Sequence, residues 1–233
     1  MKKNHSILNL IIYLFIGALI CAIFFIYYFS TKLGNGLIIC AADEVKHLTT
    51  LVMNNCIKKY IDTKPQVNLL EIEKNSQNEI SRITYNTKIL NQTSTQILDL
   101  LESDLNTMVK GKIGELGINL NKLSKEYYEQ TDNGIIFTVS VGNSTGNLLL
   151  ANIGPKIPLN LKTVGNTSAK INTKITEYGL NNAMIEINVE LVTTIAIQMP
   201  FMSKEVTVKN IVPLSMEIIQ GIVPETYLNN NLK

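Results

Sequence analysis

The feature that most constrains this chain is an uncharged, apolar stretch near its amino terminus, residues 7–29. As a helix, these 23 residues would extend about 34 Å, which exceeds the roughly 30 Å hydrocarbon core of a bilayer. A cleaved signal peptide has a shorter apolar core, about 7–15 residues, followed by small residues. This stretch ends instead in Tyr27-Tyr28-Phe29. We therefore expect residues 7–29 to be a retained transmembrane helix within a lipid bilayer.

The charged residues that flank this stretch indicate its orientation. Lys2 and Lys3 precede it, whereas Lys32 and then Asp43 follow it. The positive-inside rule places the more basic flank in the cytoplasm. We expect residues 1–6 to be cytoplasmic and the remainder to be extracytoplasmic, as in a single-pass protein of the cell membrane.

The chain beyond residue 29 is electrically neutral. The formal net charge of +2 comes from Lys2 and Lys3, which leaves 19 basic and 19 acidic residues for the remainder. The longest basic run there is Lys58-Lys59, whereas nucleic-acid-binding proteins usually carry a basic patch. We therefore expect no nucleic-acid partner. About 200 residues form one domain or two small ones, which excludes a large multidomain enzyme.

The first half of the exposed chain predicts two helices and a hairpin. Gly34 and Gly36 weaken helix formation, so residues 30–36 are predicted to be a linker with a break. Apolar spacing, alternation and the capping residue Asn86 predict the elements that follow. These are a helix over 37–61, two strands over 67–73 and 79–85, and a helix over 87–110. We assign an α-β-β-α subdomain to residues 37–130.

The second half changes to a period of two, which is typical of strands. Strands are predicted over 135–141, 159–164, 170–178, 185–199 and 206–218. The last two form a hairpin, in which Val206, Val212, Met216 and Ile218 are predicted to share one face. Pro213 indicates an edge strand or a bulge because proline cannot donate a ladder hydrogen bond. The predicted fold is α+β: a transmembrane helix, the α-β-β-α unit and an antiparallel sheet of four to five strands over 131–225, with a polar tail at 226–233.

Residues with catalytic or metal-binding chemistry are sparse. Cys40 and Cys56 are predicted on one helix, about 24 Å apart, which is too far for a disulfide. His47 is the only histidine of the exposed domain, and a lone histidine is more often a solvated or packed side chain than a catalyst. We expect no cofactor and no metal site.

Two pairs of glutamates leave one enzymatic alternative open. Glu71 and Glu73 share a strand face, as do Glu186 and Glu190. Paired carboxylates can hydrolyse glycans, so a protein that binds or cleaves peptidoglycan is conceivable. Alternating acids on a strand are more often its solvent-facing side, and we favour a protein that is not an enzyme.

Three predicted loops combine glycine, proline and apolar residues. Tight connections between strands explain them most simply. Rigid loops at the end of a sheet also commonly carry recognition, so they are the candidate contact loops. Their residues are Asn152, Gly154, Pro155, Lys156 and Pro158 in the first, Tyr178, Gly179, Asn181 and Asn182 in the second, and Gly221 and Pro224 in the third.

These segments resemble the YunB family of sporulation proteins from endospore-forming bacteria. The resemblance is specific over residues 145–225, and it lies in 149–158, 173–186, Pro200-Phe201, Val212-Pro213 and 219–224. It implies a role in spore formation for a protein made in the mother cell and held in its membrane. It implies no catalytic activity and no site residues.

We therefore expect a membrane-anchored protein needed for spore formation that acts through protein contacts with unidentified sporulation proteins. A peptidoglycan-binding or peptidoglycan-hydrolysing protein is the alternative. A second alternative is a homo-oligomer that forms rings between the mother-cell and forespore membranes, since a small α-β-β-α unit suits such a module. A sensor that binds a small ligand within the sheet is also left open.

Overall fold

The computed structural model describes residues 2–63, 68–77, 79–118, 128–131, 134–145, 149–150, 153–179, 181–200 and 202–221. It begins with a single long helix, α1 (Lys2–Thr63). The predicted break at residues 34–36 is wrong, because the helix continues through them. Gly34 is buried, and an added Cβ there would overlap the end of the Met202 side chain. The glycine therefore permits close packing of the helix on the sheet instead of ending the helix.

The predicted hairpin and second helix are confirmed. Strands β1 (Leu70–Lys74) and β2 (Ile80–Tyr85) pair antiparallel. Helix α2 (Thr87–Val109) follows at once, and its first turn is capped by Asn86, whose Oδ1 accepts a hydrogen bond from the Ile89 N–H at 3.1 Å. A short 3-10 helix, η1 (Ile113–Leu116), comes next.

The remaining strands form the main sheet, in the antiparallel order β3-β4-β5-β6-β7. An α+β fold with a sheet of five strands is therefore confirmed. The elements are β3 (Tyr128–Thr131), β4 (Gly134–Ser140), the 3-10 helix η3 (Val141–Thr145), β5 (Lys156–Glu177), β6 (Asn182–Met199) and β7 (Met202–Gln220).

Two details of the sheet differ from the prediction. The strands predicted over 159–164 and 170–178 are one strand, β5, because a register irregularity between Val164 and Ser168 takes up the intervening residues without ending the pairing. In β7, the predicted common face of Val212 and Met216 is wrong. The register shifts at Asn188 and Pro213, so Val212 pairs with Val189 but Met216 pairs with Glu186, on the opposite face.

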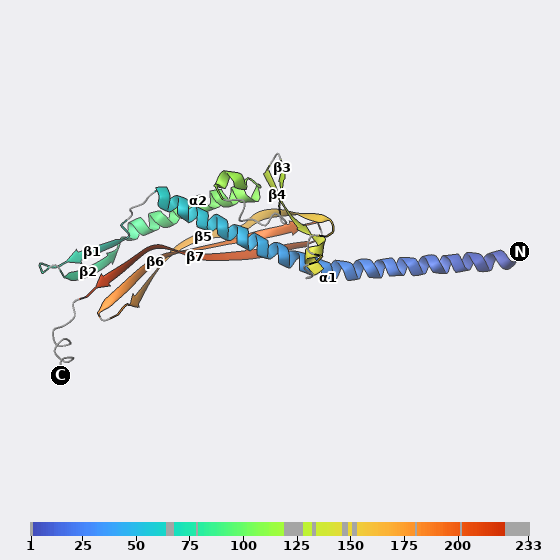
Figure 1. The fold of residues 1–233 in the computed structure, drawn as a ribbon, viewed down its shortest axis with the longest axis horizontal. Coiled ribbons are helices and arrows are strands. Elements are labelled where there is room, and N and C mark those ends of the chain that lie inside the picture. The colour runs from blue at the N-terminus through green and yellow to red at the C-terminus, as the bar shows by residue number, and fades with distance from the viewer. Residues whose placement is uncertain are drawn as a thin grey trace, which may run out of the picture.

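One face of the sheet is covered by both helices. Figure 1 shows α1 and α2 lying on the same side, where α1 packs against β7 and α2 against β5. The predicted alternation of β6 is confirmed. Its buried residues include Ile185, Ile187, Val189, Leu191, Thr193, Ile195 and Ile197. The largest buried cluster contains side chains of α1, α2 and β4 to β7, while the assigned subdomain boundaries stay a prediction.

The amino-terminal part of α1 extends well beyond the sheet (Figure 1). Large apolar side chains along it are exposed, including Tyr13 at 74%, Phe15 at 70% and Phe24 at 70%. Among the residues whose side chains the structure describes, which within 7–29 are 12–24 and 27, no helix is long and apolar enough to cross a membrane.

Candidate functional site

The structure separates the predicted contact loops into two groups. The turn between β5 and β6 contains Tyr178, Gly179, Asn181 and Asn182, and Gly221 follows β7 at the same end of the sheet. We call this end, which is the farther one from the amino terminus of α1, the distal end. The remaining described loop residues, Gly154, Pro155, Lys156 and Pro158, lie at the other end of β5. Asn152 and Pro224 lie outside the described residues.

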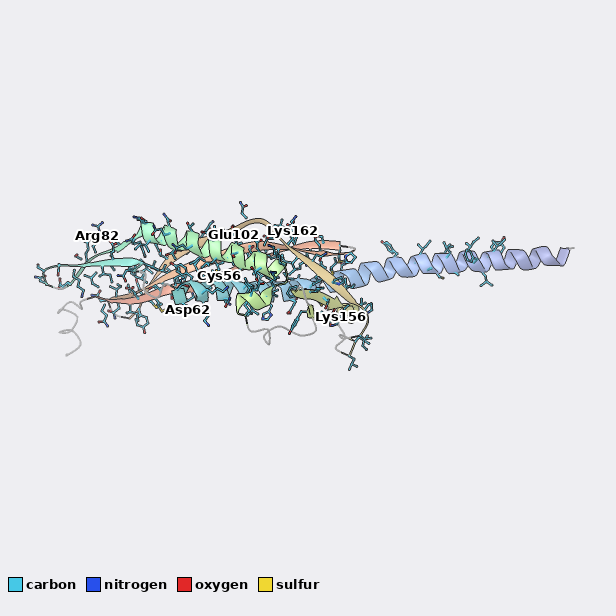
Figure 2. The ribbon with its side chains drawn as sticks, turned by 90° about the horizontal axis from the view of Figure 1, so that it is seen from above. Cys56, Asp62, Arg82, Glu102, Lys156 and Lys162 are labelled. Atoms are coloured by element: carbon cyan, nitrogen blue, oxygen red, sulfur yellow. The ribbon has the colours of Figure 1, made fainter. Side chains whose placement is uncertain are left out.

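Figure 2 shows this separation, with Lys156 near the point where α1 leaves the domain and Arg82 of β2 near the distal end. The 22 residues of β5 span this distance. At about 3.3 Å per residue, its contour length is roughly 70 Å. The described residues of the first loop therefore lie at the opposite end of β5 from those of the other two loops.

Backbone contacts hold the distal turn and the end of β7 together. The Tyr178 N–H donates to the Asn182 carbonyl oxygen at 2.9 Å, and the Gly221 N–H donates to the Asn181 carbonyl oxygen at 2.9 Å. Gly179 has φ +70°, a left-handed conformation that favours glycine. An added Cβ on Gly221 would overlap the Asn181 carbonyl oxygen. Glycine at 221 is therefore required for this close approach.

A groove lies between this distal turn and the β1–β2 hairpin. It has a volume of about 1180 Å³, and we call it the contact groove. Its lining residues are Ile72, Lys74, Gln77, Glu79 and Ile80 from the hairpin and its turn, and Glu177, Gly179, Asn181, Asn182, Ala183, Glu217, Ile218, Ile219, Gln220 and Gly221 from the sheet. Three glutamates and one lysine line the groove, so it is acidic, and its isoleucines add apolar surface.

The hairpin wall of the groove is fixed at both ends. At its base, Leu69 and Leu70 are buried in a cluster with Ile185 and Ile187 of β6. At its tip, Asn75 Oδ1 accepts hydrogen bonds from the backbone N–H groups of residues 77 and 79, at 3.0 and 2.9 Å. The walls are therefore formed by hydrogen-bonded, packed elements before any partner binds.

Glu186 and Glu190 alternate along β6 with buried residues such as Ile187 and Val189, so they lie on the sheet face opposite the helices. Glu190 accepts a hydrogen bond from Lys209 Nζ at 2.8 Å and another from Asn172 Nδ2 at 2.9 Å. The hydrogen bond from Lys209 lowers the pKa of Glu190. A general acid in glycan hydrolysis needs a raised pKa instead.

The other glutamate pair also makes structural contacts. Glu71 Oε1 accepts a hydrogen bond from Asn86 Nδ2 at 2.8 Å, which links the hairpin to the start of α2. Glu73 lies opposite Arg82 in the β1–β2 register. These positions indicate that Glu71 and Glu73 stabilise the hairpin and its junction with α2, and do not act as a pair of catalytic acids.

Cys40 and Cys56 both lie on α1, as predicted, and both thiols are free. Burial, reinforced by the nearby Asp104 carboxylate, raises the pKa of the Cys56 thiol to about 12. Burial is also the largest cause of the raised pKa of Cys40. Neither thiol therefore has the lowered pKa of a nucleophile. Among the described side chains, no three His, Cys, Asp or Glu residues could hold a metal ion.

The sequence did not indicate the hairpin half of the groove. The hairpin residues Lys74, Gln77, Glu79 and Ile80 precede the sheet residues of the groove by about 100 to 150 positions, and their local pattern indicates only a polar turn. The two walls meet only because the hairpin base packs on β6. No signal within either segment could have identified that contact.

Comparison with known proteins identifies the family of this chain. The family model described as Sporulation protein YunB matches residues 136–226, which include most of β4, all of β5 to β7 and the distal turn. Sporulation protein YunB of Bacillus subtilis strain 168 is 30% identical over 185 residues, which cover 79% of this chain and 67% of that protein. No solved structure matches the chain. The resemblance seen in the sequence is confirmed, and the chain belongs to the YunB family of sporulation proteins.

Proposed function

We propose that this protein is needed for spore formation and acts there without catalysis, as a membrane-anchored assembly factor that binds another protein in the contact groove. The observation that carries this proposal is the position of the groove. It lies at the distal end of the molecule, opposite the end from which the apolar part of α1 extends. A protein held by that helix would present the groove away from its membrane.

The proposed anchor is residues 7–29 of α1. It is supported by the absence of charge from this stretch in the sequence and by the exposure of apolar side chains such as Tyr13, Phe15 and Phe24. Exposed aromatic and aliphatic side chains along a projecting helix are unfavourable in water and favourable in lipid. We place this anchor in the mother-cell membrane, with residues 1–6 in the cytoplasm and the domain outside it.

The chemistry of the groove favours a protein partner with basic and apolar side chains. Glu79, Glu177 and Glu217 supply negative charge, and Ile72 and Ile219 supply apolar contacts within the same cavity. A groove of this kind suits an extended segment or a loop of a partner protein. Complementary charge would determine partner choice and association rate more than total affinity.

Charge reversal in the groove tests this function. The double variant Glu177→Lys, Glu217→Lys should lower the spore yield of the bacterium that makes this protein. Each reversal should weaken binding of a basic partner by roughly tenfold, or about 1.4 kcal/mol. The matched control is Asp99→Lys, Glu102→Lys, which reverses two exposed charges on α2, outside the groove. Equal spore yields in the two strains would reject the groove as the functional site.

A peptidoglycan-binding or peptidoglycan-hydrolysing protein is the less favoured function, because the pKa of Glu190 is lowered instead of raised and Glu71 is hydrogen-bonded to the Asn86 side chain. The second alternative is that the partner is another copy of this chain and that the copies form rings. The long edge strand β7 is the observation that supports it, since edge strands can pair with another chain.

A further inference from the structure

The end of the domain nearest the projecting part of α1 carries an apolar loop that the proposed function does not use. Leu149 is 84% exposed, Ile153 is 60% exposed and Leu150 is 40% exposed. Single exposed apolar residues are common on protein surfaces, whereas several large ones within five positions indicate an interaction site. We call these three residues the apolar rim.

Hydrogen bonds and close packing fix the apolar rim in place. The Gly142 N–H donates to the Ile153 carbonyl oxygen at 2.9 Å, and the Ile153 N–H donates to the Leu150 carbonyl oxygen at 2.9 Å. An added Cβ on Gly142 would overlap both of those carbonyl oxygens. The loop is therefore seated tightly on η3, and its apolar side chains point outward from a defined support.

The 3-10 helix η3, on which the apolar rim is held, contacts α1. The Cys40 thiol donates to the Asn143 carbonyl oxygen at 3.6 Å, and η3 packs on the helix. The start of β7 adds a second contact, where Met202 meets Gly34. Figure 1 shows η3 against α1 close to the point where the helix leaves the domain.

The continuity of α1 sets the distance between the apolar rim and the proposed anchor. Gly34 lies five positions after Phe29 along α1, and Cys40 lies eleven positions after Phe29. At about 1.5 Å per residue, these contacts lie about 8 and 16 Å beyond the end of the anchor. The interfacial layer of a bilayer is about 5–8 Å thick on each side. The Gly34 contact therefore lies at the outer edge of this layer and the Cys40 contact about 8 Å beyond it, and a tilt of about 20°, which is common for such helices, brings one side of the domain base nearer to the layer.

We propose that Leu149, Leu150 and Ile153 insert into the interfacial layer of the same bilayer that holds residues 7–29, so that the domain stands on the membrane in one orientation. This inference rests on the proposed anchor. Apolar burial is its driving force, because the neighbouring cation Lys156 is already paired with Glu129 at 3.2 Å. An inserted loop of this kind reaches about 5–10 Å into the boundary between headgroups and acyl chains.

Tryptophan scanning tests the inference, because the chain contains no tryptophan. The full chain would be reconstituted in phosphatidylcholine vesicles, with and without bromine on the acyl chains near the headgroup, and the quenching of each single tryptophan would be measured. Leu149→Trp and Ile153→Trp report on the rim. Ile175→Trp is the matched control, since Ile175 is 64% exposed but lies near the distal end of β5. Phe24→Trp reports on the anchor.

The expected result is quenching of the tryptophans at 24, 149 and 153 and none at 175, unchanged when the salt concentration is raised. Quenching at 24 but not at 149 or 153 would overturn the apolar rim while leaving the anchor intact. No quenching at any position would overturn both the anchor and the rim. Equal quenching at 153 and 175 would also overturn the inference, because the domain would then lie on the membrane without a preferred end. Circular dichroism of each variant checks that the fold is retained.

Discussion

Lys59 of α1 donates to both carboxylate oxygens of Asp104 of α2, at 2.9 and 3.0 Å. The Asp104 side chain is only 9% exposed, whereas the Lys59 side chain is 37% exposed. The next residue of α1, Tyr60, donates from its Oη to Thr93 Oγ1 of α2 at 2.9 Å in the same interface, about three turns from Asp104 along α2. Because α1 also carries the proposed anchor and α2 follows the hairpin of the groove, these polar contacts connect the two functional ends of the molecule.

Removing the lysine should therefore destabilise the domain. Lys59→Met keeps the apolar stem but leaves the Asp104 carboxylate buried without its cation, which should lower the free energy of unfolding by about 1–3 kcal/mol. The control is Lys112→Met. That lysine forms an exposed pair with Glu115 at 3.1 Å, and its loss should cost less than about 0.5 kcal/mol. Urea unfolding followed by circular dichroism measures both, and equal losses would contradict the structural role of the Lys59–Asp104 pair.

The Cys56 thiol should be nearly inert in the folded protein. Its pKa of about 12 leaves about one thiolate in ten thousand at pH 8, and the thiolate is the reactive form. In a Cys21→Ser, Cys40→Ser background, iodoacetamide should label Cys56 much more slowly than it labels the urea-unfolded chain. Equal rates would show that the thiol is not buried.

Because of the Cys56 thiol, the free energy of unfolding should decrease at alkaline pH. Folding raises its pKa from 9.0 to about 12, so the folded state holds this proton more tightly than the unfolded state. The resulting stabilisation is complete below about pH 9 and is lost progressively as the pH rises toward about 12.

Gly221→Ala should damage the contact groove without unfolding the sheet. Its Cβ would overlap the Asn181 backbone, which cannot move aside as a flexible side chain could. We expect a loss of about 1–3 kcal/mol in stability, as for other overpacked positions, and a lower spore yield. Gly114→Ala is the control, because nothing lies within 4 Å of an added Cβ there. A normal spore yield for the folded Gly221→Ala protein would contradict the role of the distal turn.

The glutamates on the sheet face opposite the helices should be dispensable for spore formation. The double variant Glu186→Gln, Glu190→Gln removes both carboxylates but keeps their size. Spore yield should be unchanged, because the pKa of Glu190 is lowered by its Lys209 hydrogen bond and neither residue lines the groove. A severe sporulation defect in this strain would instead support the enzymatic alternative.

Local patterns predicted the elements whose causes are local. The Asn86 cap and the apolar spacing after it identified α2, and alternation identified β6, because each signal lies within its own element. The break at Gly34 and the parity after Pro213 were predicted incorrectly. Both depend on a partner elsewhere in the chain: Met202 packs on the glycine, and Asn188 pairs opposite the proline.

The candidate site was predictable only in part, for the same reason. Turn chemistry identified Tyr178, Gly179 and Asn181, but it grouped them with Gly154 and Pro155, which lie at the other end of β5. Composition identifies a turn without locating it in space. The acidic groove emerges only when the hairpin and the sheet, which are distant in the sequence, are brought together. The apolar rim is local in the sequence, but its position beside α1 depends on the contact of η3 with that helix.

Binding of a partner protein at the distal groove can be detected by site-specific photo-crosslinking during sporulation. A photoreactive residue at Gln77, which lines the groove, should give a discrete cross-link to one protein, at a segment rich in basic residues, and the Glu177→Lys, Glu217→Lys change should abolish it. The same residue at the exposed position Lys58 of α1, outside the groove, should give no such product. A cross-link to a second copy of this chain would identify the partner as the chain itself. No specific product from Gln77, or the same products from Gln77 and Lys58, would contradict the binding of a partner at the groove.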